Sequence, residues 1–502
     1  MQPSRFTIRV PLTDRDEVFL MNTFSDAQLI VSTDVAAWLD RLAAAPADAT
    51  ALTGDEREAA ATLAEHGFLV ADRDSESRTL DEFFTSVRED RSQLRVTVLT
   101  TLQCNFACDY CVQGDHDDHN KFAAKMSLET AGRLASWIEA KLDELGSQSF
   151  ALTFFGGEPL LNQPVMFYLA ERLWQASQVR GVHMFVNLIT NGLLLTPEVV
   201  DRLTPYGLNG VKVTLDGDRE THDRVRPLRG GQGTFDRIVA NIRRVADRCR
   251  ISIGGNFDVE TADRYPALLD FLREQDFAGS VVKVAFKPVI KSSAGAGERY
   301  REGTRSEERG TSRAPGSEAG GRGSGVGGII PLTAVGTDGR PLGGACMTTA
   351  GSGTSVCDSC HFVDEKLAFL REETKKRGFS TPDGVHMGPC EIHRRHAYTI
   401  GPDGSLYACP GFSGEPTLST GHIDQRPEDW RRRVADRFEK IAAWKDCADC
   451  PFVPVCAGGC TTASHVELGD MDRPNCHRAS FEAGVATLAA EAAAAAPLVS
   501  VS

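Results

Sequence analysis

The sequence predicts an α/β protein whose largest unit is a partial (β/α)6 barrel. Between residues 94 and 290, apolar strand-like runs alternate with helical segments such as residues 127–145 and 266–275. Repeated βα units with short connections favour a parallel sheet, and six of them fit an open or partial barrel. The six runs cover residues 94–101, 149–155, 183–190, 210–217, 251–257 and 281–289. In such folds the chemistry lies at the carboxyl ends of the strands, so the residues that follow each run are the candidates for a site.

Composition limits the class of protein. The chain has 502 residues, of which 41% are hydrophobic and 25% charged, as in an ordinary globular protein of about three domains. A formal net charge of −14 would repel a phosphate backbone, so we expect no nucleic-acid partner. The sequence has neither an apolar run of about 18 residues nor an apolar signal core at its start. We therefore expect a cytoplasmic protein without a membrane partner.

The first 85 residues predict a small α+β domain. Strand-like runs at 6–11, 18–24 and 27–33 precede helical periodicity at 35–45 and 54–67. This order resembles a winged-helix module. The polar residues 86–93 are predicted to be a linker to the barrel.

Beyond the barrel the composition changes three times. Residues 291–345 are rich in Gly, Ser and charge, which predicts a flexible insertion. Residues 346–480 form a cysteine-rich domain with few apolar runs, which predicts stabilisation by metal. The Ala-rich residues 481–502 predict a terminal helix without a chemical role.

The cysteines carry most of the functional information. Fourteen cysteines in a chain without a secretion signal indicate metal ligands rather than disulfides. Cys104, Cys108 and Cys111 follow the first barrel strand as a CxxxCxxC triplet. Three thiolates on one loop can hold a [4Fe–4S] cluster and leave its fourth iron without a protein ligand. A zinc loop is the alternative for this triplet, with His116 and His119 nearby.

The segment 104–111, CNFACDYC, resembles the signature of radical S-adenosylmethionine (SAM) enzymes. In that family the open iron chelates the amino and carboxylate groups of SAM. Two further motifs are similar to family motifs at the following strand ends, namely Gly156-Gly157-Glu158-Pro159 and Thr190-Asn191-Gly192. The glycines would let backbone approach the ligand, and the carboxylate of Glu158 would suit the methionine ammonium. Asn191 belongs to the same SAM-binding set by resemblance.

A fourth motif follows the fourth strand. Thr214-Leu215-Asp216-Gly217, followed by His222, Asp223 and Arg226, resembles the family's SLDG…HD…R element, with Thr214 in place of the usual serine. The resemblance implies that Thr214 and Asp216 lie at the SAM site and that Arg226 binds the SAM carboxylate or ribose. Tyr110 would pack on the adenine or hydrogen-bond to it.

The resemblance implies an activity as well as a fold. A one-electron donor of the flavodoxin or ferredoxin type would reduce the cluster, which would cleave SAM to methionine and a 5′-deoxyadenosyl radical. This radical would abstract hydrogen from an unactivated carbon of the substrate. No residue of the sequence is assigned as a further catalytic group.

Seven cysteines between 390 and 476 resemble the SPASM domain, an extension of radical SAM enzymes that carries two auxiliary [4Fe–4S] clusters. The resemblance assigns one cluster to Cys447, Cys450, Cys456 and Cys476. It assigns the other to Cys390, Cys409 and Cys460, which need a fourth ligand. A pair of structural zinc sites is the alternative.

The missing fourth ligand has several candidates. Cys357 and Cys360 form a CxxC pair upstream of Cys390, and the predicted helix 364–378 would carry the chain across the domain. Cys346 is a weaker candidate because it borders the predicted insertion. An open fourth iron that binds the substrate remains the alternative. The lone Cys249 is interpreted as a packing residue.

Proteins with this domain order include enzymes that modify ribosomally made precursor peptides. We expect such a peptide maturase, which oxidatively modifies its precursor and most readily crosslinks it, with the product left open between a thioether, a carbon–carbon or carbon–oxygen bond and an epimer. The N-terminal domain would bind the precursor's leader as an added strand. A sulfatase-type formylglycine maturase is the first alternative, weakened because Cys409-Pro410-Gly411 stands where that group resembles Cys-Asp-x-Tyr. A non-enzymatic, metal-stapled scaffold that binds peptides is the second.

Overall fold

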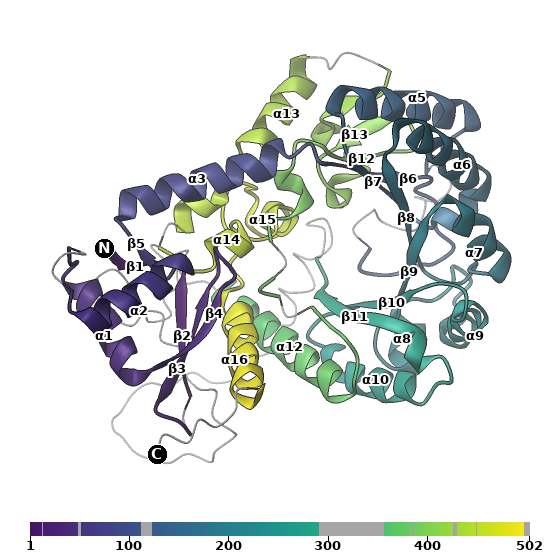
Figure 1. The fold of residues 1–502 in the computed structure, drawn as a ribbon. Helices are drawn as coiled ribbons and strands as arrows, with labels where there is room; N and C mark the ends of the chain where they lie inside the picture. Colours follow the sequence, from purple (N-terminus) through teal and green to yellow (C-terminus); the bar gives the residue numbers. More distant parts are fainter. Residues whose placement is uncertain are drawn as a thin grey trace, which may run out of the picture.

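A computed structural model shows the chain as one curved sheet flanked by helices, with a smaller sheet at its amino-terminal side (Figure 1). It describes residues 1–12, 14–48, 52–111, 123–290, 356–382, 384–386, 388–424, 429–447 and 449–495. The predicted insertion at 291–345 and the lone Cys346 lie outside these ranges.

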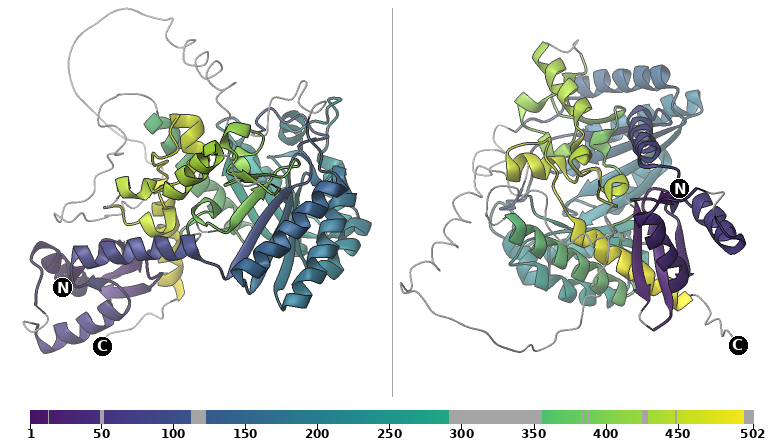
Figure 2. Two further views of the ribbon diagram at one scale, coloured as in Figure 1. Left: turned by 90° about the horizontal axis from the view of Figure 1, so that it is seen from above. Right: turned by 90° about the vertical axis from the view of Figure 1, so that its left-hand side faces the viewer.

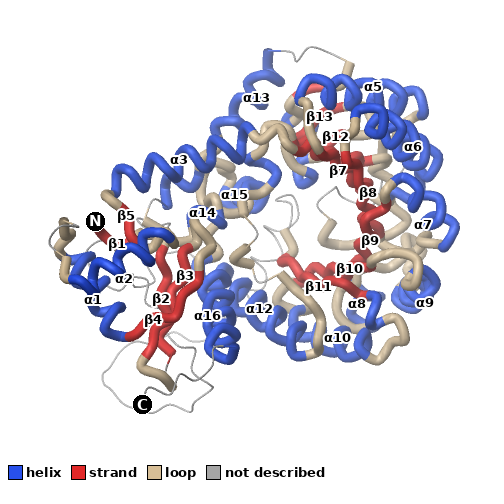
Figure 3. The backbone as a smooth tube through the Cα atoms, viewed as in Figure 1, coloured by secondary structure: helices blue, strands red, loops and turns tan. Residues whose placement is uncertain are grey.

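Six parallel strands in chain order run inward from one edge of a nine-stranded sheet, which confirms the predicted α/β barrel segment. They are β6 (Gln93–Leu99), β7 (Ser149–Phe155), β8 (His183–Thr190), β9 (Leu208–Thr214), β10 (Ile251–Phe257) and β11 (Val281–Pro288). Every neighbouring pair among them is parallel. In the described ranges β11 is an edge strand, so the barrel is open (Figure 3).

Helices cover the outer face of this sheet (Figures 1 and 2). They are α5 (Leu128–Leu145), α6 (Gln163–Arg180), α7 (Pro197–Leu203), α8 (Arg219–Val225), α9 (Phe235–Val245) and α10 (Tyr265–Arg273). Alternate strand residues such as Phe150, Leu152 and Phe154 face these helices and are fully buried. Strand residues of the other parity face the concave side, where the sheet is open to a substrate.

The cysteine-rich segment continues the same sheet, which the sequence did not predict. Strand β12 (Ala397–Ile400) pairs in parallel with β6, and β13 (Ser405–Tyr407) and β14 (Gly421–His422) follow in antiparallel order. The helices of this half are α12 (Val356–Lys376), α13 (Asp429–Lys440), α14 (Val453–Cys456), α15 (Thr461–Leu468) and α16 (Arg478–Ala495). The cysteine loops are therefore anchored directly to the first strand of the barrel.

The N-terminal unit contains an antiparallel meander, β2 (Thr7–Leu12), β3 (Glu17–Asn22) and β4 (Gln28–Ser32), where three strands were predicted. It continues with α1 (Thr33–Ala44) and α2 (Gly54–Glu65), and β1 (Gln2–Pro3) pairs with β5 (Leu69–Val70). Helix α2 starts at a capping box in which Thr53 and Glu56 bond to each other's backbone N–H.

A long helix, α3 (Arg73–Glu89), replaces part of the predicted linker at 86–93. Its apolar face packs on the cysteine-rich segment, where the Phe84 ring stacks on Trp444 with ring centroids 4.1 Å apart. Helix α16 packs on β2 and on α12, with Val485 and Ala489 buried against Ile8. The Ala-rich tail thus joins the N-terminal sheet to the barrel side of the molecule.

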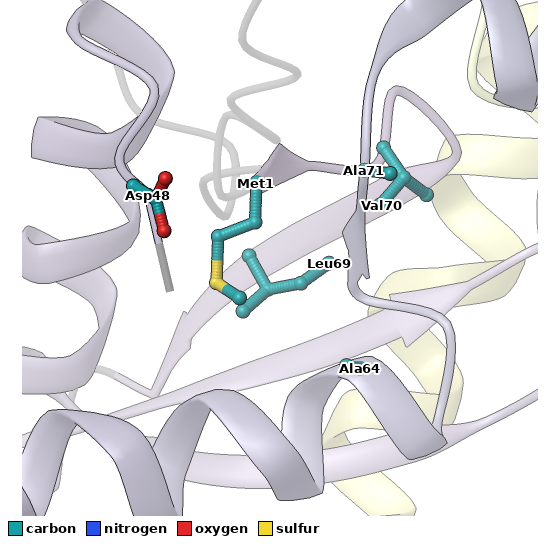
Figure 4. A pocket seen from close by; sticks show the side chains of 6 residues that line it. All are labelled: Met1, Asp48, Ala64, Leu69, Val70 and Ala71. Carbon is teal, nitrogen blue, oxygen red and sulfur yellow. The ribbon is translucent and has the colours of Figure 1, made fainter. Parts of the chain in front are cut away.

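The N-terminal unit also has a pocket, shown in Figure 4. Its lining consists of Met1, Asp48, Ala64, Leu69, Val70 and Ala71, and it contains none of the residues predicted to bind a cofactor. In the part of the chain that the structure describes, every helix is too short or too polar to cross a membrane.

Candidate cofactor site at the carboxyl ends of the strands

The loop with the first three cysteines leaves β6 and is held against Pro227 and Leu228. Phe106 forms an isolated bridge with Leu228, and the Ala107 N–H donates to the Pro227 carbonyl at 3.0 Å. Burial raises the pKa of Cys104 to about 11 and that of Cys108 to about 12, and the neighbouring thiols add to both shifts. The three sulfurs therefore lie close enough to influence one another. Such thiols become thiolates when a metal centre supplies positive charge.

The two glycines after β7 permit a close approach to the start of this loop. A Cβ on Gly156, whose φ is +132°, would lie 2.3 Å from the Thr101 carbonyl oxygen. A Cβ on Gly157 would lie 2.2 Å from the carbonyl oxygen of Gln103. The sequence prediction was that these glycines admit a ligand. In the structure they meet the backbone of Thr101 and Gln103, which lead into Cys104. Their contact with SAM remains a prediction.

Glu158 lies next to the glycines and is completely buried. Its carboxylate accepts hydrogen bonds from Thr190 Oγ1 at 2.7 Å, from the Asn191 N–H at 2.8 Å and from the Leu160 N–H at 3.0 Å. Burial raises the pKa of this carboxyl, and the three donors act in the opposite direction. The predicted role was to bind an ammonium group. The observed contacts make Glu158 the anchor of the turn after β8, and its binding of the methionine ammonium stays a prediction.

Asn191 connects that turn to the cysteine loop. Its side-chain amide donates to Asn105 Oδ1 at 2.7 Å and lies 3.9 Å from Cys104 Sγ. Asn105 was not among the predicted residues. Its position between the first two cysteines was the available signal.

Tyr110, Asp216 and Arg226 form one buried cluster, as their shared assignment to the SAM site requires. The Tyr110 hydroxyl donates to the Asp216 carboxylate, and the Arg226 guanidinium donates to that hydroxyl and, at 3.4 Å, to Asp216. Asn256, at the carboxyl end of β10, completes the cluster through its N–H to Asp216 at 2.7 Å and its amide to Tyr110 at 3.3 Å. Sequence reasoning missed Asn256 although it occupies a strand end. Thr214 lies half-buried at the end of β9.

His222 holds this cluster from behind. The Asp216 N–H donates to His222 Nδ1 at 3.1 Å, so the ring proton lies on Nε2, which donates to Thr234 Oγ1 at 3.0 Å. Thr234 in turn donates to the Arg226 carbonyl at 3.0 Å. Burial and the nearby Arg226 hold the pKa of His222 well below its usual range, so the ring is neutral. Asp223 caps α9 instead, since it accepts from the Thr234 and Phe235 N–H groups.

The donor set fits an iron–sulfur cluster with SAM beside it. Three thiols lie on one loop, with Cys108 buried and the other two half-buried. The Arg226 guanidinium lies near them, and its buried Nε has no hydrogen-bond partner in the described residues. The Arg226 guanidinium also lies over the Phe106 ring, 5.6 Å from its centroid. A ligand carboxylate or ribose oxygen would satisfy the unpaired N–H.

The C-terminal cysteines gather in two sets of the predicted membership. Cys447, Cys450 and Cys476 all raise the pKa of the buried Cys456. Cys390 and Cys460 raise that of Cys409, which reaches about 11 mainly through burial. Gly459 lets the chain fold back between them, since a Cβ there would lie 1.9 Å from the Asn475 carbonyl oxygen. Within the described ranges, no three His, Cys, Asp or Glu side chains form a group that could hold a single metal ion.

The other cysteines are placed only in part. Cys357 and Cys360 lie in the first turns of α12, but their side chains lie outside the described residues. The structure confirms the helix predicted after them at 364–378 in most of its length. Cys249 packs against the barrel core, and its thiol, whose pKa burial raises to about 11, lies 3.7 Å from the Val245 carbonyl oxygen.

Comparisons with known proteins agree with this geometry. The chain is 25% identical over 224 residues to Fe-coproporphyrin III synthase of Methanosarcina barkeri, across 44% of this chain and 50% of that protein. It is 23% identical over 176 residues to a cysteine-type anaerobic sulfatase-maturating enzyme of Clostridium novyi, across 35% of this chain and 46% of that protein. The chain thus spans about half the length of these curated relatives.

Among solved structures, native anSMEcpe with bound AdoMet and Cp18Cys peptide matches with a TM-score of 0.53 and 16% identity, across 80% of this chain and 97% of that chain. At this identity the likeness shows a common fold. The model of the radical SAM superfamily matches residues 98–272, a range that begins at the end of β6 and includes the first cysteine loop and the Asp216–Arg226 cluster. Residues 98–272 of this chain are therefore a radical SAM domain.

Proposed function

We propose that the chain is a radical SAM peptide maturase with two auxiliary iron–sulfur clusters. The proposal rests on one observation: the chain has, in addition to a radical SAM domain, two further sets of neighbouring thiols, one of four cysteines and one of three. Radical SAM enzymes use a [4Fe–4S] cluster to deliver one electron to SAM. The auxiliary clusters, which remain a proposal, would be held by these two sets, with Cys357 or Cys360 as the further ligand of the set of three.

The residues of the domain have distinct tasks in this proposal. Cys104, Cys108 and Cys111 hold the cluster, and Asn191 fixes the loop between the first two thiols through Asn105. The free Nε of Arg226 binds an oxygen of SAM, while Asp216 and Tyr110 hold its guanidinium in place. Asp216 is fully buried and its carboxylate accepts the Asn256 N–H, so water is excluded from this carboxylate and its position is fixed.

The exposed edge of the N-terminal sheet supports a peptide partner. Strand β4 pairs on one side only, with β3, so in the described residues its other backbone edge has no strand beside it. Such an edge accepts an extended segment by strand addition, which takes its affinity from main-chain hydrogen bonds. We infer that the precursor's leader binds along Gln28–Ser32. The peptide named in the anSMEcpe complex supports a peptide as the substrate class.

The test uses a short precursor encoded beside this chain's gene. The reduced, iron-loaded enzyme is incubated with SAM and this peptide, and the product is weighed by mass spectrometry. Loss of two hydrogens indicates a crosslink, and an unchanged mass with altered stereochemistry indicates an epimer. Cys249→Ala is the matched control, because it removes a thiol outside all three sets. An unmodified peptide in the presence of normal SAM cleavage contradicts the maturase proposal.

A sulfatase-type maturase is the second candidate, favoured by the Clostridium novyi relative. Against it, Cys409 is followed by a 3₁₀ turn at Pro410–Phe412 whose Gly411 N–H points to Cys409 Sγ at 3.4 Å. No carboxylate occupies the positions directly after Cys409. A sulfatase-derived cysteine peptide offered as sole substrate distinguishes the two: conversion to formylglycine favours this candidate.

A further inference from the structure

Three lysines occupy one corner of the concave face of the barrel sheet. Lys212 lies on β9, and Lys283 and Lys287 lie on β11. The strand register places Lys212 beside Ser252 of β10, and Ser252 beside Lys283. Residues paired in a parallel sheet share a face, so Lys212 and Lys283 form one row, with Cα atoms about 10 Å apart across two strand spacings.

The face is the one that looks away from the helices. The residues on either side of Lys212, Val211 and Val213, are buried in the core against α9 and α10, as is Val284 beside Lys283. Successive side chains alternate between the two faces of a strand. The three ammonium groups therefore lie toward the open side of the barrel, where a substrate has access.

Gly254 leaves space for the Lys212 side chain. A Cβ on Gly254 would lie 2.5 Å from Lys212 Cε and 3.3 Å from its Nζ. Lys212 therefore runs over Gly254, which lies two residues beyond its register partner Ser252 and beside Thr214. This path brings its ammonium toward the carboxyl end of the sheet, where the candidate SAM site lies.

The lysines have no anionic partner among the described residues. The charged groups that influence Lys212 are Lys287 and Lys283, and together with burial they lower its pKa to about 8. This gathering of positive charge stands out in a chain of net charge −14. Three positive charges on one face repel one another, and this repulsion is unfavourable in the folded protein. A bound anion would reduce the repulsion.

The position of the cluster connects it to both ends of the candidate site. Lys287 is paired in register with Asn256, which contacts Tyr110 and Asp216. Lys287 also lies near enough to Cys390 to oppose the rise in its thiol pKa. The corner thus lies between the radical SAM site and the set of three C-terminal thiols.

We propose that Lys212, Lys283 and Lys287 bind a carboxylate of the peptide substrate and so hold the peptide across the open barrel. The inference rests on the proposed peptide substrate and adds its chemistry, a carboxylate in the segment that reaches the barrel. Its source is an acidic side chain or the chain terminus. Both present the same group to the lysines.

Lysine footprinting on the iron-loaded enzyme with SAM tests the proposal. An amine-acetylating reagent is applied at neutral pH with one of three synthetic peptides of equal length, and modification at each lysine is read by mass spectrometry. The first peptide contains glutamates and an amidated end, the second replaces them with glutamines, and the third is the second with a free carboxyl end. We expect the first or the third to protect the three lysines several-fold more than the second. Lys376, paired with Glu372 on α12, serves as the internal control.

Protection by the glutamate peptide alone identifies a side-chain carboxylate, and protection by the third identifies the terminus. Equal protection by all three, or none by any, overturns the proposal. The variant Lys212→Met keeps the unbranched apolar part of the side chain and removes its charge, and it should abolish the difference between the peptides at Lys283 and Lys287. Footprinting needs no turnover. If the enzyme modifies its precursor but no lysine is protected, only this inference is refuted. If the lysines are protected but no peptide is modified, the inference stands and the maturase proposal is refuted.

Discussion

At the residue scale, the site shows which motif residues contact one another and which support them. Tyr110 of the cysteine loop meets Asp216 and Arg226 of the motif after β9 in one cluster, and the contact of these residues with SAM stays a prediction. Glu158 and His222 belong to the same motifs, but their hydrogen bonds go to backbone and hydroxyl groups of the protein. The type of residue in a motif is readable from sequence. The direction of its side chain depends on neighbours that only the fold brings together.

His222 gives the first prediction. The variant His222→Ala leaves the Asp216 N–H and Thr234 Oγ1 without their buried partner. We expect the free energy of unfolding to fall by about 1–3 kcal/mol and the apparent KM for SAM to rise. Chemical denaturation and SAM-cleavage kinetics measure the two effects. His183→Ala, at an exposed position on β8, is the control. A variant as stable as the control contradicts the positioning role of His222.

Lys212 gives a prediction of pH dependence. Burial and two neighbouring lysines lower its pKa to about 8, so its amine loses its proton within a mildly alkaline range. The rate of acetylation at Lys212 should reach half its maximum near that pH, whereas Lys376, whose pKa is raised by its bond to Glu372, should react half-maximally at higher pH. Because the neutral amine attracts no carboxylate, protection by an acidic peptide should weaken as the pH rises through this range. Identical profiles for the two lysines contradict the assignment.

At the scale of elements, the six barrel strands were predicted because each is an apolar run with turn residues at its ends. The helix α3, the strands β12–β14 and the docking of α16 were not. Strand β12 has four residues, too short for a periodicity, and it exists because β6 offers it an edge. Helix α3 has a polar composition, and its few apolar residues pack in a cluster shared by Phe6 and Phe24 of the N-terminal unit and Trp444 of the cysteine-rich segment.

The contact between α3 and Trp444 gives the next prediction. Phe84 is 4% exposed and stacks on Trp444, so Phe84→Ala removes the centre of the contact between the N-terminal unit and the cysteine-rich segment. We expect a loss of about 3–5 kcal/mol in unfolding free energy, with faster proteolysis between the two units. Glu82→Ala, at an exposed position of the same helix, is the control. Equal protease resistance in both variants contradicts the contact's role.

The β4 edge can be tested by proline substitution. Adjacent strand residues direct their N–H groups to opposite sides, so of Leu29→Pro and Ile30→Pro one breaks the bond to β3 and the other removes an edge donor. The variant that keeps the wild-type melting temperature is the edge variant. It should raise KM for the precursor while SAM cleavage without precursor stays unchanged. Normal KM in this variant argues against leader binding along β4.

At the scale of the whole molecule, the first cysteine set follows strand β6 of the barrel sheet, whereas the set of four lies on and around α14, beyond the last strand. The three sets could be predicted because the spacing of their cysteines is visible in the sequence, and in the structure the members of each set lie near one another. The lysine corner was not readable, because Lys212 and Lys287 are 75 positions apart and meet only through strand register. The distribution of chemistry over the molecule thus follows from topology.

Iron content tests the division of labour among the sets. The triple variant Cys104→Ala, Cys108→Ala, Cys111→Ala should bind about four fewer irons than the wild type, since a [4Fe–4S] cluster is lost as a unit. Its fold should persist, because Cys108 is the one cysteine of the three that belongs to the buried barrel core, whereas Cys104 and Cys111 lie at its margin. Single variants Cys357→Ala and Cys360→Ala, compared with Cys249→Ala, show which upstream thiol belongs to the set of three. If both variants keep the iron content and the cluster spectra of the wild type, neither thiol is a ligand of the set of three, and the cluster of that set has an open fourth iron.

The central claim is that residues 98–272 generate a radical from SAM, and quantification of 5′-deoxyadenosine tests it most directly. The anaerobically reduced, iron-loaded enzyme is incubated with SAM, and the nucleoside is measured by liquid chromatography and mass spectrometry beside the triple cysteine variant and Cys249→Ala. We expect 5′-deoxyadenosine from the wild type and from Cys249→Ala and none above background from the triple variant. Equal amounts from the triple variant and the wild type, or none from a wild type that carries its full iron, would contradict the account.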